Sequence, residues 1–226
     1  MNKRFLPLLL FVAIFLGLVV SASHSGAAQP QRPSLAAALP DRHALRLADD
    51  WEHKFRLTSD TFENDQEVPA SMVFSGQLGS VCTGSNTSPN LEWKHGPEGT
   101  RSYVVALFDD SANFAHWGQY NIPPDTNKLP AGAGTAGNGP GLQVYNDAFN
   151  LGYTGPCPPP GSATNTDGIH HYVFTVYALD KELDLIPAPA FPPFADGLYR
   201  AMIDHVIDHA SITGLFNCNN DSTACN

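Results

Sequence analysis

An apolar stretch in the second half of the chain reads Tyr172-Val173-Phe174-Thr175-Val176-Tyr177-Ala178-Leu179. Aromatic and β-branched residues dominate it and polar residues precede it, a pattern that is typical of a buried β-strand. A second stretch of the same kind runs over residues 102–108. The two stretches predict central strands of a β-rich core.

The surrounding sequence adds weaker elements. Residues 55–58 alternate in polarity and residues 72–74 form a short apolar run, so both are further strand candidates, whereas residues 131–141 are rich in Gly and Ala and predict a loop. One helix is predicted from about Phe194 to Ser211, because Leu198, Ala201, Met202 and Val206 recur at helical spacing. Strands followed by a late helix predict one mainly β, sandwich-like domain.

The composition excludes several classes of protein. The chain has 226 residues, of which 42% are hydrophobic, and a formal net charge of -10. Such an acidic chain lacks the basic surface of a nucleic-acid-binding protein, and it has too many large apolar residues for a disordered one. Four cysteines are too few for a small disulfide-dense scaffold.

The first residues predict a signal peptide over residues 1–28. Lys3 and Arg4 precede an apolar run over residues 5–20, and small residues follow. The alternative is a retained membrane anchor, but the run is shorter than the roughly 20 residues that a spanning helix needs. Removal of the peptide leaves an exported protein with no membrane-spanning segment, and Pro-containing residues 29–50 predict a linker or loosely packed arm.

Export brings the four cysteines into an oxidising compartment, where disulfides persist. Cys218 and Cys225 bracket a short polar segment that a disulfide would close, which leaves Cys82 to pair with Cys157. The alternative is a set of buried free thiols. Metal binding by these residues is disfavoured because no two of them have the C-x-x-C spacing.

Polar residues that could bind a ligand or act in catalysis lie where the predicted strands begin and end. Asp109 ends one strand, His116 follows it, and His170 and Tyr172 begin the other. The Pro-rich residues 152–161 lie between them and form a stiff wall with few backbone donors. Imidazolium and phenol groups donate hydrogen bonds and a carboxylate can orient an imidazole, so the set suits a small anion.

Several motifs, in order, resemble the phosphatidylethanolamine-binding protein family, which includes the Raf kinase inhibitor protein. The first part of the resemblance is carried by residues 82–93, 97–103, 109, 116–117 and 121–123. The second part is carried by residues 152–153, 155–159, 170–172 and 176–180. The resemblance spans about residues 55–216, and the Cys-containing motifs are similar to the bacterial-type branch.

The resemblance implies a β-sandwich with a Greek-key core and a C-terminal helix over residues 51–216, followed by a tail over residues 217–226. It also implies a pocket for phosphate or a phospholipid head group, lined by Asp109, His116, His170 and Tyr172 with a wall of Gly155, Cys157, Pro158 and Pro159. We therefore expect a binding module without a cofactor rather than an enzyme. It would inhibit or regulate a protein partner that the sequence does not identify.

Three departures separate this chain from the family pattern. Ser111 replaces the second acidic residue of the D-P-D-A-P motif, and both prolines of that motif are absent. His171 stands where the family usually has Arg. Residues 162–168 resemble a small insertion before the second His motif. A histidine in place of arginine makes anion binding more sensitive to pH.

The alternative function is an exported hydrolase or metal-dependent enzyme that uses the same His and Asp residues. Neither a G-x-S-x-G elbow nor an H-E-x-x-H motif is present. His205 and His209 have the spacing of zinc ligands on the predicted helix. We prefer to interpret them as residues that lie at the edge of its apolar face. For an anion site, affinity is expected to fall as the pH rises through about 6.5.

Overall fold

The computed structural model describes residues 54–75, 82–159, 161–185 and 194–218. The predicted signal peptide, the linker and most of the tail therefore lie outside the described residues. In the described part of the chain, no helix is long and apolar enough to cross a membrane.

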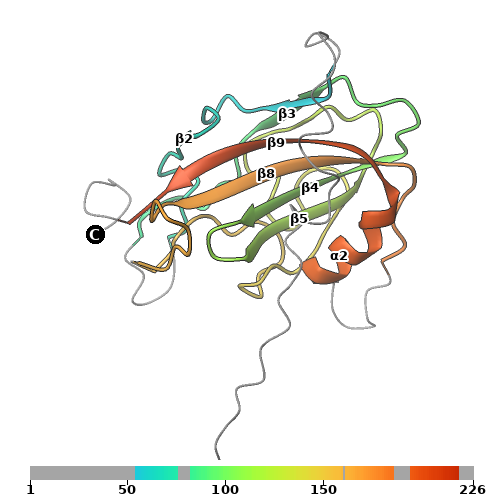
Figure 1. Ribbon diagram of the computed structural model, residues 1–226. Helices are drawn as coiled ribbons and strands as arrows, with labels where there is room; N and C mark the ends of the chain where they lie inside the picture. The colour runs from blue at the N-terminus through green and yellow to red at the C-terminus, as the bar shows by residue number, and fades with distance from the viewer. Residues whose placement is uncertain (1–53, 76–81, 160, 186–193, 219–226) are drawn as a thin grey trace, which may run out of the picture. The chain divides into compact units, whose positions relative to one another are not determined.

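A six-stranded sheet forms the larger layer of the domain (Figure 1). Its order is β2-β9-β8-β4-β5-β7, and all neighbours are antiparallel except β2 and β9. The strands are β2 (Gln66–Glu67), β4 (Ser102–Asp109), β5 (Phe114–Ile122), β7 (Leu142–Gln143), β8 (His170–Leu179) and β9 (Val206–Phe216).

The two strongest strand predictions are confirmed as β4 and β8, which pair side by side in the middle of this sheet. Their side chains alternate between two apolar clusters, as the period of two of a β-strand requires. On β4, Val105 and Leu107 face one cluster, whereas Val104 and Ala106 face the other. Both faces of the sheet are therefore covered.

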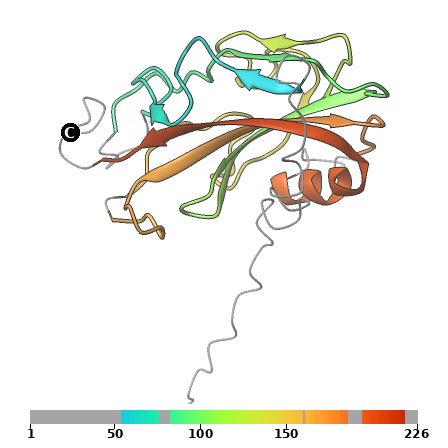
Figure 2. The ribbon, with the colours of Figure 1, turned by 45° about the horizontal axis from the view of Figure 1, so that its top comes forward.

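A three-stranded sheet covers one of these faces (Figure 2). It consists of β1 (Arg56–Thr58), β3 (Leu91–Lys94) and β6 (Lys128–Leu129), in the order β1-β3-β6. Leu57, Trp93 and Leu129 from this sheet share an apolar cluster with Leu107 and Phe174 from the larger one. The mainly β, sandwich-like architecture is thus confirmed.

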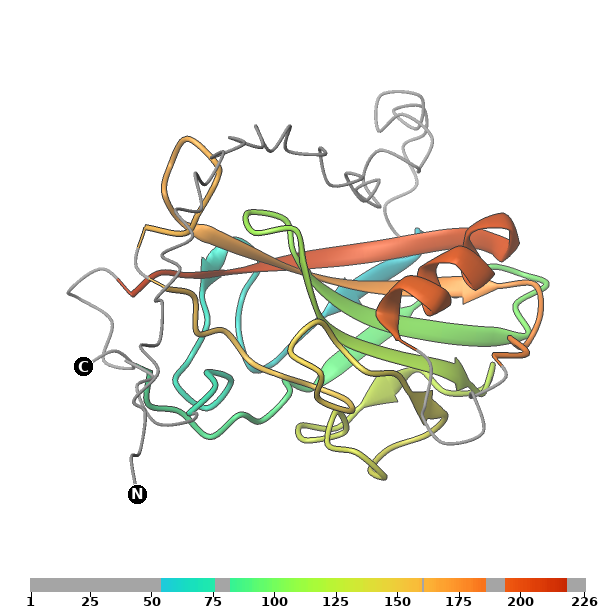
Figure 3. The ribbon, with the colours of Figure 1, turned by 90° about the horizontal axis from the view of Figure 1, so that it is seen from below.

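The opposite face of the larger sheet carries the helix α2 (Ala195–Met202), seen lying against the sheet in Figure 3. Leu198 and Met202 are buried against Val104 and Ala106 of β4. This packing accounts for the apolar spacing in the first half of the predicted helix.

The predicted extension of this helix to Ser211 is wrong. A short 3₁₀ turn, η1 (Ile203–His205), follows α2, and the chain then extends into β9. Ala210, Ile212 and Phe216 are buried on one face of β9, at the spacing of a strand. Pairing with β8 over most of its length overrides the helical pattern of the sequence.

Candidate functional site

The centre of the candidate site is a buried pair between the end of β4 and the start of β8. Asp109 Oδ2 lies 2.6 Å from His170 Nδ1, and the two side chains are only 2% and 3% exposed. Asp109 Oδ1 accepts backbone N–H groups from Ser111 at 2.9 Å and Ala112 at 3.2 Å. Both oxygens of the carboxylate are thus used, and His170 is held with Nδ1–H toward Asp109.

His116 lies on β5, the neighbour of β4, and its ring is buried. Its Nδ1 donates a hydrogen bond to the carbonyl oxygen of Thr154 at 2.8 Å. Burial lowers the pKa of His116 below its usual value, although the Thr154 carbonyl and the charge of Asp109 act in the opposite direction. The ring is therefore neutral near pH 7, with the lone pair on Nε2.

Tyr172, at the start of β8, completes the cluster. Its ring meets the His116 ring edge-on with centroids 5.1 Å apart, and it stacks on His170 at 6.2 Å. Its hydroxyl is buried beside the Asp109 carboxylate and has no partner at full hydrogen-bonding distance among the described residues. Burial and the charge of Asp109 raise the pKa of Tyr172, so the group is a neutral donor. Since buried polar groups are normally paired, this hydroxyl is an unmet donor.

A buried asparagine positions the His116 side of the cluster. Asn146 is fully buried, and its Nδ2 donates to the carbonyl of His116, the carbonyl of Gly152 and the hydroxyl of Thr154 at 2.8–3.0 Å. It therefore fixes both His116 and the residue whose carbonyl orients the His116 ring. Asn146 was not among the predicted site residues because it lies in a loop that carries none of the family motifs.

The predicted wall is built as a segment held on both sides. Gly155 N donates to Asn86 Oδ1 at 2.7 Å, and a Cβ at Gly155 would collide with the carbonyl oxygen of Met72. The carbonyl of Pro156 accepts a hydrogen bond from Phe74 N at 3.0 Å. Pro158 is buried, whereas Pro159 is exposed. Close backbone approach explains the glycine at position 155.

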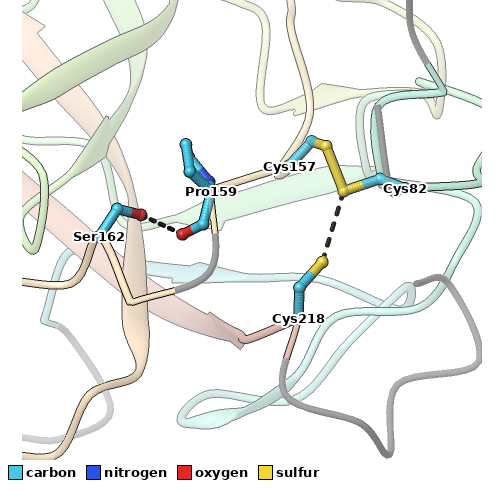
Figure 4. Close-up of a disulfide and its surroundings, with 5 residues drawn as sticks. All are labelled: Cys82, Cys157, Pro159, Ser162 and Cys218. Carbon is cyan, nitrogen blue, oxygen red and sulfur yellow. Dashed lines mark hydrogen bonds between the residues drawn. A yellow bond between two sulfur atoms is a disulfide. The ribbon is translucent and has the colours of Figure 1, made fainter. Parts of the chain in front are cut away.

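A disulfide ties this wall to the rest of the domain. Cys82 and Cys157 are bonded as expected, and Cys218 Sγ lies 3.5 Å from Cys82 Sγ (Figure 4). Cys218 is itself disulfide-bonded. Its predicted partner, Cys225, lies outside the described residues.

The insertion before the second His motif brings in a residue that sequence reasoning missed. Ser162 Oγ lies 3.0 Å from His170 Nε2 and 2.5 Å from the carbonyl oxygen of Pro159, which Figure 4 shows beside it. The insertion is anchored to the cluster through Ser111, whose hydroxyl accepts from Asn165 Nδ2 at 2.8 Å and from the His171 backbone at 3.0 Å. Ser111, which replaces the second acidic residue of the motif, therefore bonds both the insertion and the backbone of His171.

The side chains of His171, His205 and His209 contact other groups than the Asp109–His170 pair. His171 contacts Asp167 at 2.9 Å, and His205 contacts Asp180 at 3.0 Å. His209 stacks on Tyr177, on β9 rather than on a helix, so the helical spacing of zinc ligands is not formed. In the described ranges, no group of three or more His, Cys, Asp or Glu side chains is arranged to hold a metal ion.

Comparison with known proteins agrees with this geometry. The family model described as phosphatidylethanolamine-binding protein matches residues 58–217, which include all the residues of the cluster. The chain belongs to the phosphatidylethanolamine-binding protein family. The family therefore accounts for the sandwich and for the order of the motifs along it.

Relatives within this family include proteins from bacteria and archaea. The crystal structure of Escherichia coli YbcL, titled a member of the mammalian PEBP family, is 33% identical and has a TM-score of 0.63. The match covers 72% of this chain and 98% of that one. A UPF0098 protein of Methanothermobacter thermautotrophicus is 38% identical over 60% of this chain and 86% of its own length. Mycobacterium tuberculosis LppC, whose name contains the word lipoprotein, is 35% identical over 53% of this chain and 54% of its own length.

Proposed function

We propose that the Asp109–His116–His170–Tyr172 cluster binds a small anion, either phosphate or the phosphoryl head group of a lipid. The observation that carries the proposal is the buried Tyr172 hydroxyl, which lies beside the Asp109 carboxylate but has no partner at full hydrogen-bonding distance among the described residues. Leaving such a donor unpaired costs about 1–3 kcal/mol, which an anion bound at this position would offset.

The electrostatics of the cluster also support an anion. The carboxylate oxygens of Asp109 accept hydrogen bonds from His170 Nδ1 and from two backbone N–H groups, so the carboxylate does not face an incoming ligand unopposed. His116 Nε2, the ring nitrogen that does not bond Thr154, becomes a second donor when the ring is protonated. Because the whole chain carries a net charge of -10, binding depends on these local donors.

Export belongs to the same proposal. The charged and apolar start of the sequence and the Cys82–Cys157 disulfide both favour an oxidising compartment. The word lipoprotein in the name of the relative LppC is consistent with export. The proposed protein is thus an exported anion-binding module.

Isothermal titration with phosphate, phosphoethanolamine and acetate tests the proposal. Wild-type protein is expected to bind the two phosphoryl compounds more tightly than acetate. Tyr172→Phe removes only the unpaired hydroxyl and should weaken phosphate binding by about tenfold or more, the value of one charge-assisted hydrogen bond. Comparison of the two phosphoryl compounds separates free phosphate from a head group as the ligand.

Tyr177→Phe is the matched control, because Tyr177 lies on the same strand but faces the opposite apolar cluster. It should leave phosphate affinity unchanged. Equal phosphate affinity in the wild type and Tyr172→Phe would contradict the proposal, as would the absence of binding by the wild type.

A further inference from the structure

Ser162, His170 and Asp109 form a continuous hydrogen-bonded chain of three side chains. Ser162 Oγ is 3.0 Å from His170 Nε2, and His170 Nδ1 is 2.6 Å from Asp109 Oδ2. We propose that this chain is a serine nucleophile with its base and its orienting carboxylate, and that it hydrolyses small carboxylic esters. A catalytic triad is recognised by these contacts and roles, so the absence of a G-x-S-x-G elbow does not argue against it.

The burial of the three groups suits these roles. Asp109 is buried, and two backbone N–H groups hold its second oxygen, so it can keep the proton of His170 on Nδ1. His170 Nε2 then carries the lone pair that accepts the proton of Ser162. Ser162 is only half-buried, which leaves its hydroxyl within reach of a substrate.

The position of Ser162 is fixed by the insertion that carries it. The Ser162 hydroxyl contacts two acceptors, the Pro159 carbonyl oxygen and His170 Nε2, and it donates to one of them at a time. Thr164 Oγ1 donates to the carbonyl of Ser111, and Asn165 Nδ2 donates to the carbonyl of Ile169. The loop therefore holds the nucleophile beside its base, as preorganised catalysis requires.

The proposed reaction has two balanced steps. Ser162 Oγ attacks the carbonyl carbon of the ester while His170 Nε2 takes the hydroxyl proton, and the alcohol leaves with that proton as the ester C–O bond breaks. Water then attacks the acyl-serine, gives a proton to His170 and releases the carboxylic acid, which restores the Ser162 hydroxyl.

A fluorophosphonate probe tests the nucleophile directly, since attack by Ser162 Oγ on phosphorus expels fluoride and leaves a stable adduct. The wild type is expected to be labelled at Ser162, as mapped by mass spectrometry, and to hydrolyse p-nitrophenyl acetate. Ser162→Ala should lose the adduct and reduce the protein-dependent hydrolysis at least tenfold. Ser211→Ala is the matched control, because Ser211 contacts Thr175 and no histidine, and it should react like the wild type.

Asp109→Asn provides a second readout, because it disturbs the tautomer of His170 without touching the nucleophile, and it should slow labelling of Ser162. No adduct on wild-type protein, an adduct on another residue, or hydrolysis that persists in Ser162→Ala would overturn the inference. Phosphate binding without labelling would leave the anion site intact and show that Ser162 only anchors the loop. The two proposals therefore fail independently.

Discussion

The hydroxyl of Tyr172 is expected to lower the stability of the ligand-free protein and to strengthen the binding of an anion. In the free protein this donor is desolvated and has no partner at full hydrogen-bonding distance among the described residues. Tyr172→Phe should therefore leave the free energy of unfolding unchanged or raise it by about 1 kcal/mol. Urea unfolding without phosphate measures this effect, and a loss of more than about 2 kcal/mol would show that the hydroxyl is paired in solution.

His116 makes anion binding dependent on pH. Asp109, Asp147 and His170 are the charged or titratable groups that act on its ring, and burial is the largest influence and lowers its pKa. Protonation at Nε2 adds a donor and a positive charge, so affinity should rise as the pH falls. The midpoint should lie below the ordinary histidine value of about 6.5, lower than the sequence alone suggests.

Sulfate is the suitable probe for this prediction, because its charge stays constant over the range in which His116 titrates. Its affinity should be higher at pH 5 than at pH 7.5 in the wild type, and His116→Gln should flatten this dependence. The same pH dependence in both proteins would assign it to another group.

The lowered pKa of His116 also affects stability. Between its folded value and the ordinary value of about 6.5, the unfolded chain binds the proton and the folded protein does not. The free energy of unfolding contributed by this residue therefore decreases as the pH falls through that window. Urea unfolding across the window should show a smaller decrease for His116→Gln than for the wild type, and an identical decrease would contradict the prediction.

At the scale of elements, two glycines give opposite predictions. Gly197 lies in α2, where an added Cβ meets nothing within 4 Å, so Gly197→Ala should stabilise the fold by about 0.5–1 kcal/mol. Gly214 lies in β9, where a Cβ would collide with the side chain of Val68, so Gly214→Ala should destabilise it by about 1–3 kcal/mol. Thermal unfolding of both variants measures the difference. Stabilisation by Gly214→Ala would contradict the close packing of Gly214 against Val68.

The elements that the sequence predicted well are those whose residues agree locally with their surroundings. β4 and β8 are mostly apolar between their polar ends and are buried on both faces, so their sequences identify them as central strands. β5 was missed because Gln119 is polar yet fully buried, where its Nε2 donates to the Pro140 carbonyl. β9 was misread because its apolar residues continue the spacing of α2, and only pairing with β8 distinguishes them.

The candidate site divides in the same way. Asp109, His116, His170 and Tyr172 were found because strand ends and family motifs mark them. Asn146 and Ser162 act through contacts with residues distant in the chain or on an insertion, and no local pattern announces such contacts. Sequence reasoning therefore found the groups that face the proposed ligand and missed those that position them.

At the scale of the whole molecule, the Cys82–Cys157 disulfide joins segments 75 residues apart in sequence. A link of this span lowers the conformational entropy of the unfolded chain, and its loss is expected to reduce the free energy of unfolding by about 4 kcal/mol. Urea unfolding of the double variant Cys82→Ser/Cys157→Ser tests this value. The double variant should also bind phosphate more weakly because the wall loses its tie, whereas a loss below about 1 kcal/mol would contradict a structural role.

An NMR titration of the histidine ring signals with pH, with and without phosphate, tests directly whether the cluster binds an anion. Phosphate is expected to raise the pKa of His116 because the bound anion favours the protonated ring. The exposed pair of His205 and Asp180 provides a reference within the same spectrum. An unchanged His116 titration in saturating phosphate, or an equal shift at His205, would contradict an anion site at this cluster.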